Sequence, residues 1–305
     1  MELQQLRYVV AVAGTGNFSR AAEQCHVAQP SLSQQIQKLE EELGERLFDR
    51  LPRRAKLTAA GETFLPRAQR ILAEVETAQR ELREAHDQLR GRLTLGVLPT
   101  IAPYLLPPII AEFSDACPEV EIIVQEDTTA RLLKLGCACE LDLAIASLPI
   151  ADDRFEMETL FSEELLLAMP PTHPLAAKKR VRLSDLETER FILMKEGHCL
   201  GDQVLYFCNR RDFRPQVTCR SVQIETIQAL VHAGLGISMV PKMAVDKAAR
   251  SGPIYRSLEA PQPTRAIIAL WPRQRRLSRI AETFLDHLRQ FARKRTVSRP
   301  NKTSR

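Results

Sequence analysis

A long apolar seam in the first third of the chain constrains the fold more than any other feature. Apolar residues recur at alternating spacings of four and three, which is an unbroken heptad pattern. The members of the seam are Phe64, Ala68, Ile71, Val75, Ala78, Leu82, Ala85 and Leu89. A helix over residues 59–90 is about 45 Å long and cannot bury such a seam alone. We therefore expect a linker helix that dimerises with a second copy of the chain. The alternative is a helix packed on its own domain.

Three shorter helices are predicted before this seam. Apolar residues at helical spacing mark the first, over residues 3–13, and a second covers residues 19–25. Pro30 stands in the first turn of the third helix, where proline is tolerated, and Gly44 ends that helix. Two helices joined by a tight turn, preceded by a helix that packs on both, form a helix-turn-helix. The alternative is an unrelated helical domain with a solvated polar face.

A basic segment follows the third helix. Five of the eleven residues from 46 to 56 are Lys or Arg, and one is Asp. We interpret this segment as a wing hairpin placed to contact phosphates or a minor groove. Such a run is usually a solvated loop, but its position directly after a helix-turn-helix favours the functional interpretation. Residues 1–58 are therefore predicted to form a winged DNA-binding domain.

From Gly91 onward the pattern changes to alternating strands and helices. Strands are expected at 93–98, 120–124, 141–146, 165–169, 191–194, 236–240 and 266–271, and helices at 104–116, 128–136 and 224–233. Repeated units of this kind predict an α/β fold with a mostly parallel sheet. The repeat restarts near residue 165, so we expect two lobes with a cleft between them. Their predicted bounds are 91–163 plus 267–295 for one lobe, 164–266 for the other, and 296–305 for a basic tail.

Charge and cysteine content exclude several classes of protein. The net charge of +5 resides in the C-terminal end, because residues 273–305 hold eleven basic and two acidic residues whereas residues 1–90 are neutral overall. No run of eighteen apolar residues predicts a membrane span, and the N-terminus lacks a signal-like core, so a cytoplasmic protein is expected. Seven dilute cysteines do not make a disulfide scaffold. Cys137 and Cys139 are too close for an ordinary zinc knuckle, so no metal and no cofactor are expected.

Two threonines stand where ligands bind in sheets of this type. Thr100 follows the first predicted strand of the α/β region, and Thr129 follows the second. Ligands lie beyond the carboxyl ends of parallel strands, so both hydroxyls are expected to face one cleft. Each threonine alone is better explained as a helix cap. Together they form a plausible polar rim for a small ligand.

The N-terminal residues closely resemble those of LysR-type transcriptional regulators. Between Asn17 and Gly61 the chain contains, in order, S-x-A-A, Q-P-S-L-S-x-Q-I, L-E-x-x-L-G, L-F-x-R and L-T-x-A-G. The resemblance implies a winged helix-turn-helix, a long linker helix and a two-lobed effector domain like a periplasmic binding protein. It implies a tetramer built as a dimer of dimers, promoter DNA and RNA polymerase as partners, and no enzymatic activity. The DNA-contacting residues that it implies are Gln29, Ser31, Ser33 and Gln34 on the third helix, and Arg50, Arg53 and Arg54 on the wing.

A second resemblance concerns the segment from Met194 to Gln203. Its Lys-Glu-Gly-His-Cys-Leu run and Asp-Gln pair, with Cys208 nine residues after Cys199, resemble the peroxide-sensing OxyR branch of the family. Gly201 departs from the arginine expected there, which removes a positive charge near the thiol. The resemblance implies a redox pair, Cys199 and Cys208, and a peroxide pocket formed by Thr100, Thr129, His198, Asp202 and Arg265. Without it, Cys199 is equally well explained as a buried packing residue.

The implied chemistry predicts a conformational signal. Attack of the Cys199 thiolate on hydrogen peroxide gives a sulfenic acid, which Cys208 resolves into a disulfide that glutaredoxin or thioredoxin reduces. Apolar residues between the two cysteines indicate a helix in the reduced state, and nine helical residues rise about 13.5 Å. A disulfide needs Cα atoms within roughly 7 Å, so oxidation of such a helix must unwind it. The implied output is activation of oxidative-stress genes, although the residues alone leave activation and repression open.

Two rival functions remain at this point. One is a LysR-type regulator that binds a small metabolite in the cleft, with both cysteines incidental. The other is a thiol peroxidase that uses the same cysteine pair for detoxification. The helix-turn-helix argues against the peroxidase, because a detoxifying enzyme has no use for a DNA-binding domain.

Overall fold

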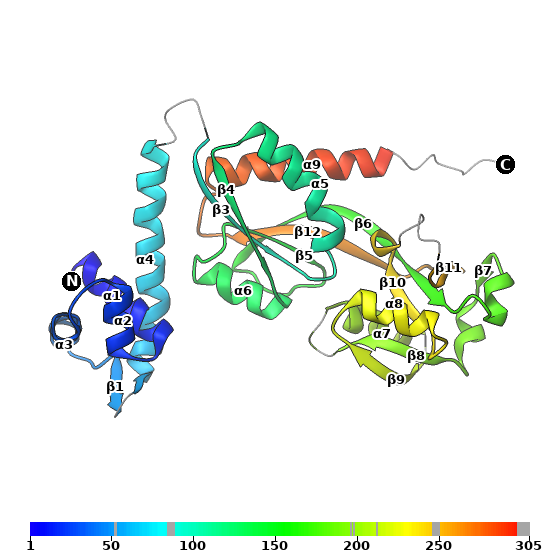
Figure 1. Cartoon of the computed structure of the whole chain (residues 1–305), viewed down its shortest axis with the longest axis horizontal. Coiled ribbons are helices and arrows are strands. Elements are labelled where there is room, and N and C mark those ends of the chain that lie inside the picture. The colour runs from blue at the N-terminus through cyan, green and yellow to red at the C-terminus, as the bar shows by residue number, and fades with distance from the viewer. Residues whose placement is uncertain are drawn as a thin grey trace. The chain divides into compact units, whose positions relative to one another are not determined.

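The computed structural model describes residues 1–51, 54–83, 89–195, 197, 199–211, 213–245 and 251–297. The chain divides into two compact units (Figure 1). The first comprises Met1–Asp87 with Cys137–Glu140, and the second comprises Gln88–Gly136 with Leu141–Arg305. Each is described by itself below.

The first unit is the predicted winged helix-turn-helix followed by a long helix. Its elements are α1 (Leu3–Thr15), α2 (Phe18–Gln24), α3 (Gln29–Leu43), the hairpin strands β1 (Phe48–Leu51) and β2 (Arg54–Leu57), and α4 (Ala59–Arg83). Local chemistry explains the boundaries. The Asn17 side chain accepts hydrogen bonds from the backbone N–H groups of Ser19 and Arg20, and so caps α2. Gly44 ends α3 in the left-handed conformation, at φ +71°.

A buried carboxylate attaches the wing to α3. Glu40, which is 7% exposed, accepts hydrogen bonds from the backbone N–H groups of Leu47 at 2.8 Å and Phe48 at 3.1 Å. Both residues belong to the core that α1, α2 and α3 share. The carboxylate therefore sets where the hairpin leaves the helical core.

We expect Glu40→Ala to destabilise the wing by about 2–3 kcal/mol, because two buried N–H groups lose a charged acceptor. Hydrogen-exchange mass spectrometry of peptides across residues 45–57 measures this as faster exchange. The matched control is Glu41→Ala. Glu41 is exposed, and its carboxylate accepts a surface hydrogen bond from the Gln37 side chain. Equal exchange in the two variants would contradict the role of Glu40.

The apolar seam of α4 is divided between two environments. At its start, Phe64 packs against the core of the first unit and Ala68 is fully buried. Further along, Ile71 is 38% exposed and Ala78 is also exposed. The side chain of Leu82 lies outside the described residues. The start of the seam thus packs on its own domain, while pairing with a second copy through Ile71, Val75 and Ala78 stays a prediction.

The second unit is built on one large mixed sheet. Its strands are β3 (Gly91–Val97), β4 (Val120–Glu126), β5 (Leu143–Ser147), β6 (Phe155–Met169), β7 (Arg180–Val181), β8 (Arg190–Met194), β9 (Gln216–Ser221), β10 (Ser238–Pro241), β11 (Ile254–Leu258) and β12 (Thr264–Pro272). The sheet order is β4-β3-β5-β12-β6-β11-β7, with β10 also paired to β6, and β8 and β9 form a separate parallel pair. The helices are α5 (Ala102–Ala116), α6 (Thr129–Cys137), α7 (Cys199–Asn209), α8 (Ile224–His232) and α9 (Arg279–Val297), with short 3-10 turns η1 (Pro174–Ala177), η2 (Leu183–Leu186) and η3 (Lys242–Ala244).

The expectation of a mostly parallel sheet is wrong for the middle of this unit. Strands β3, β4 and β5 pair in parallel, but β12 is antiparallel to both β5 and β6, and β10 and β11 are antiparallel to β6. The reason is topological. The long strand β6 carries the chain out of the first group of strands and helices, and β12 carries it back (Figure 1). Neighbouring strands that run out and back are antiparallel.

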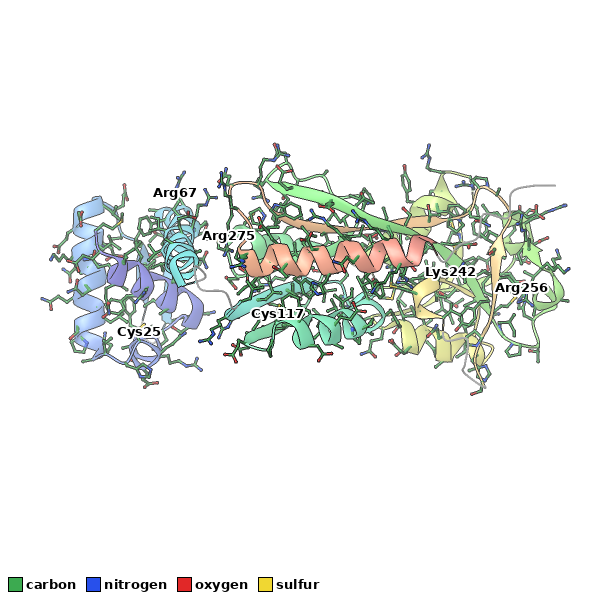
Figure 2. The ribbon with its side chains drawn as sticks, turned by 90° about the horizontal axis from the view of Figure 1, so that it is seen from above. Cys25, Arg67, Cys117, Lys242, Arg256 and Arg275 are labelled. Carbon is green, nitrogen blue, oxygen red and sulfur yellow. The ribbon has the colours of Figure 1, made fainter. Side chains whose placement is uncertain are left out.

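Two groups of buried side chains lie along these connecting strands. The second-lobe core gathers residues from β8, β10, α7 and α8, with Phe191, Val204, Ile227 and Met239 among them. In the other group, α5 and α9 meet through the Phe113 and Phe284 rings, whose centroids are 5.2 Å apart. Arg275 lies just before α9 (Figure 2). Its side chain donates a hydrogen bond to Asp142 at 3.1 Å. The exact lobe bounds given above stay a prediction, because β6 and β12 pass through both groups.

Candidate functional site

Cys199 is the first residue of α7, directly beyond the carboxyl end of β8. Burial raises the pKa of its thiol above the ordinary value, and the negative charge of Asp202 acts in the same direction. The Arg265 guanidinium and the Thr129 hydroxyl act in the opposite direction, since both lower the pKa of the Cys199 thiol. Helix α7, strand β12 and helix α6 therefore supply groups that act on a single sulfur.

Arg265 is fully buried and is held at three points. Its Nε donates to Glu163 Oε1 at 2.8 Å, its Nη1 donates to Thr100 Oγ1 at 3.0 Å, and its Nη2 donates to the Thr100 carbonyl at 3.0 Å. The second oxygen of Glu163 accepts from the backbone N–H of Met243 at 2.9 Å. A buried arginine with this many fixed partners provides a stationary positive charge beside the thiol.

One buried oxygen near this cluster, Gln203 Oε1, has no hydrogen-bond partner in the described part of the chain, and the Thr129 hydroxyl faces the Cys199 thiol. The amide nitrogen of Gln203 donates to Ser147 Oγ at 2.8 Å and to the Leu148 carbonyl at 2.6 Å, so its orientation is fixed. Buried polar atoms almost always have partners, and those that do not are candidates for contacting a small polar molecule. Gln203 Oε1 is therefore a candidate contact for a small molecule that donates a hydrogen bond.

The structure brings together four of the residues expected around the pocket: Cys199, Thr100, Thr129 and Arg265. The side chain of Asp202 is exposed and reaches the thiol only through its charge. His198 lies outside the described residues. Three further residues, Glu163, Ser147 and Gln203, were not predicted.

Sequence signals existed for two of these three. Ser147 is the last residue of β5, and Thr100 comes shortly after the end of β3. Because ligands bind beyond the carboxyl ends of parallel strands, the argument that selected Thr100 also selects Ser147. Gln203 belongs to the Asp-Gln pair of the segment quoted above. Glu163 lies in the polar half of β6, which no strand prediction covered.

Gly201 has a packing role in the first turn of α7. A Cβ atom at this position would lie 2.9 Å from the carbonyl oxygen of Met194, the last residue of β8. Any larger side chain therefore requires α7 to move away from β8. Glycine at position 201, where arginine was expected, thus allows α7 to approach β8 closely.

Cys208 lies in the last turn of α7, fully buried in the second-lobe core. Burial raises the pKa of its thiol to about 11. The segment between the two cysteines is helical, as expected. Nine helical residues make about two and a half turns, so the two thiols point to opposite sides of α7 as well as being far apart along it. No disulfide joins them in this conformation, in which both are free.

Two of the other cysteines directly follow helices. Cys25 follows α2 and Cys117 follows α5 (Figure 2). Burial raises the pKa of both thiols. In the described residues, no group of three or more His, Cys, Asp or Glu side chains is arranged to hold a metal ion.

The residues expected to contact DNA lie on α3 and the wing. Gln29, Ser31 and Gln34 are exposed on α3, and Ser33 is half-buried. Arg54 is exposed on β2, whereas the Arg50 side chain and the whole of Arg53 lie outside the described residues. Their contacts with DNA stay a prediction. None of the described helices has the length and apolarity needed to cross a membrane.

Two family models match the chain. The model described as "Bacterial regulatory helix-turn-helix protein, lysR family" matches residues 3–62. The model described as "LysR substrate binding domain" matches residues 86–293. Together they match parts of both units.

Individual proteins with similar sequences and structures point to one branch of that family. A "Hydrogen peroxide-inducible genes activator" of Dickeya chrysanthemi is 35% identical over 293 residues, which is 94% of this chain and 96% of that protein. A full-length OxyR variant of Pseudomonas aeruginosa superposes with a TM-score of 0.77 at 34% identity, covering 95% of this chain and 98% of that one. A hydrogen peroxide-bound OxyR mutant of Corynebacterium glutamicum gives a TM-score of 0.64 at 32% identity, covering 97% and 96%.

Proposed function

The chain belongs to the LysR family of bacterial helix-turn-helix regulators, and on that premise we propose that it is a hydrogen peroxide sensor that controls oxidative-stress genes. The observation that carries the proposal is the Cys199 thiol in a buried polar cluster with Arg265, Thr129 and Thr100. Similarity to proteins named as peroxide-inducible activators supports it.

The proposed reaction oxidises two thiols and reduces one peroxide. The Cys199 thiolate attacks one peroxide oxygen, the O–O bond breaks, and the leaving hydroxide takes a proton to become water. Cys199 is then a sulfenic acid. The Cys208 thiol loses its proton, its thiolate attacks the sulfur of this sulfenic acid, the S–O bond breaks as the S–S bond forms, and the leaving hydroxide takes up a proton to become a second water. Glutaredoxin or thioredoxin returns both sulfurs to thiols.

The pocket residues have distinct roles in this proposal. Arg265 and Thr129 stabilise the Cys199 thiolate, against the burial that favours the thiol. The unpartnered oxygen of Gln203 and the oxygen of the Thr129 hydroxyl accept hydrogen bonds from the peroxide, and Thr100 holds the Arg265 guanidinium. His198, which the family resemblance implicates, is proposed to protonate the leaving oxygen.

The disulfide is proposed to act through α7. Bond formation requires Cys208 to leave the second-lobe core, because the two thiols lie on opposite sides of the helix. The helix must therefore unwind, and the apolar side chains of Leu200 and Val204 lose their packing. We propose that this local refolding changes how copies of the chain assemble on promoter DNA, as a dimer of dimers that contacts RNA polymerase.

Footprinting on the DNA upstream of the gene tests the proposed function. The full chain is expected to protect DNA of one length when reduced and of another after peroxide treatment. The change should be absent in a Cys199→Ser variant. A footprint that responds to a small metabolite and not to peroxide would favour the metabolite-sensing alternative. Sustained peroxide turnover with a thiol reductant, far above one equivalent, would favour a thiol peroxidase.

Two exposed side chains of the DNA-binding unit test how DNA is read. Arg54→Ala is expected to weaken binding to every sequence alike and to reduce the slope of log K against log salt by about 1, because one phosphate contact is lost. Gln34→Ala is expected to change sequence preference with little change in that slope. Binding titrations over a salt series on matched and scrambled sites measure both effects. Equal losses across all sites for both variants would contradict base readout by α3.

A further inference from the structure

The buried carboxylate of Glu163 accepts a hydrogen bond from Arg265, the arginine that acts on the Cys199 thiol. Glu163 on β6 and Arg265 on β12 are directly opposite each other across the antiparallel pair. Their side chains are 7% and 0% exposed, and their Nε to Oε1 distance is 2.8 Å. The mechanism proposed above assigns no role to Glu163.

Further hydrogen bonds fix the orientation of both side chains of the Glu163–Arg265 pair. Thr100 holds the far end of the guanidinium with both its hydroxyl and its carbonyl oxygen, at 3.0 Å each. The backbone N–H of Met243 holds the second carboxylate oxygen. Since both ends are anchored independently of each other, the carboxylate stays at the Nε end of the guanidinium and Thr100 stays at its Nη end.

A neighbouring negative charge weakens the field that a guanidinium exerts on a thiolate. We propose that Glu163 is a positioning residue that acts through Arg265 and limits how far the guanidinium stabilises the Cys199 thiolate. The reduced sensor would then keep its sulfur less reactive than Arg265 alone would make it. This inference rests on the proposed function for its biological meaning.

Other charged or titratable groups near the thiol and the pair stay unchanged in the test below. Asp202 acts on the thiol from α7 itself. Tyr104 on α5 lies near Arg265 and donates a hydrogen bond to Glu225 on α8 at 2.6 Å. Burial and this bond raise the pKa of Tyr104, so it stays neutral over the tested range. Lys195, which precedes α7, is exposed.

The informative substitution is Glu163→Gln in the full chain. The amide oxygen can still accept the hydrogen bond from Arg265 Nε, and the negative charge is gone, but the amide NH2 group cannot accept from the backbone N–H of Met243, so that bond is lost. Iodoacetamide alkylation between pH 6 and pH 10, with tandem mass spectrometry to assign the label to Cys199 and not to Cys208, gives the pH midpoint of thiol reactivity. We expect the midpoint to fall by about one pH unit, which makes Cys199 about tenfold faster to alkylate at pH 7. An unchanged or raised midpoint would overturn the proposal.

Glu164→Gln is the matched control. Glu164 is the next residue, is also buried, and lies on the opposite face of β6, so its substitution should change the rate less than about twofold. An Arg265→Gln background tests whether Glu163 acts through the arginine. There, adding Glu163→Gln should also change the rate less than about twofold. The same tenfold gain in that background would show direct action on the thiol and overturn the proposal.

The double variant, Glu163→Gln with Arg265→Gln, keeps the proposal testable if Glu163→Gln alone fails to fold. It removes both charges of the pair, so it leaves neither charge buried without its partner. If the single variant does not fold, equal rates for the double variant and for Arg265→Gln support the proposal, and a tenfold difference overturns it. Alkylation involves no peroxide. A wild-type Cys199 that fails to react with peroxide would therefore count against the proposed function and leave the effect of Glu163 measurable.

Discussion

Replacing Cys199 with serine is expected to abolish the reaction with peroxide, with a loss of at least about a hundredfold in the oxidation rate, because a serine hydroxyl is not a nucleophile at neutral pH. Cys208→Ser should instead stop the reaction one step later. Its Cys199 should still be oxidised but should accumulate as sulfenic acid, which dimedone traps. Intact-mass and peptide mass spectrometry of peroxide-treated protein distinguish the two results.

The matched control for both variants is Cys219→Ser. Cys219 lies on β9, partly buried against the same core, but on a different element from the proposed pair. It should leave the 199–208 disulfide and its rate of formation unchanged. A disulfide that forms between other cysteines in the wild-type chain, or peroxide oxidation that survives in Cys199→Ser, would contradict the proposed mechanism.

The second large effect is expected from Arg265→Met. Removal of the guanidinium leaves Glu163 buried without its partner, which costs about 3–5 kcal/mol of folding stability at neutral pH. It also removes a group that lowers the pKa of the Cys199 thiol. The thiol pKa then rises further, the thiolate fraction at pH 7 falls, and alkylation slows. Urea unfolding of the full chain and the alkylation rate measure the two effects.

Arg289→Met is the control for stability. Arg289 makes comparable ion pairs with Glu158 and Asp286, but its side chain is 39% exposed, so its loss should cost less than about 1 kcal/mol. Adding Glu163→Gln to Arg265→Met should restore most of the stability without restoring the alkylation rate. Equal free energies of unfolding for Arg265→Met and Arg289→Met would show that the buried Glu163–Arg265 pair does not stabilise the fold more than an exposed ion pair does.

Local patterns predicted the DNA-binding unit well. Asn17 caps α2, proline stands in the first turn of α3, and Gly44 ends α3, each through contacts within a few residues. The wing hairpin was also correctly placed, because its strands are adjacent in the sequence. The seam of α4 was a partial success. Its spacing correctly indicated a long helix, but spacing alone could not show that Phe64 packs on its own domain.

The pocket was only partly predictable. Thr100 and Thr129 follow from a general rule about strand ends, whereas Cys199 and Arg265 were identified only through the family resemblance. Glu163 escaped prediction because the predicted strand began at residue 165 and left out residues 155–164 of β6. The sheet was wrongly expected to be mostly parallel for the same reason.

By itself the sequence determined the helices of the DNA-binding unit, the wing and the strand ends that precede Thr100 and Thr129, because each depends on interactions between neighbours along the chain. Only the tertiary structure decided which groups surround the sulfur. Glu163 and Arg265 are separated by 102 residues, and Gln203 and Ser147 by 56. They meet because β6 pairs with β12 and because α7 lies against the end of β5. Strand pairing over such distances depends on the packing of the whole unit, and no local pattern specifies it.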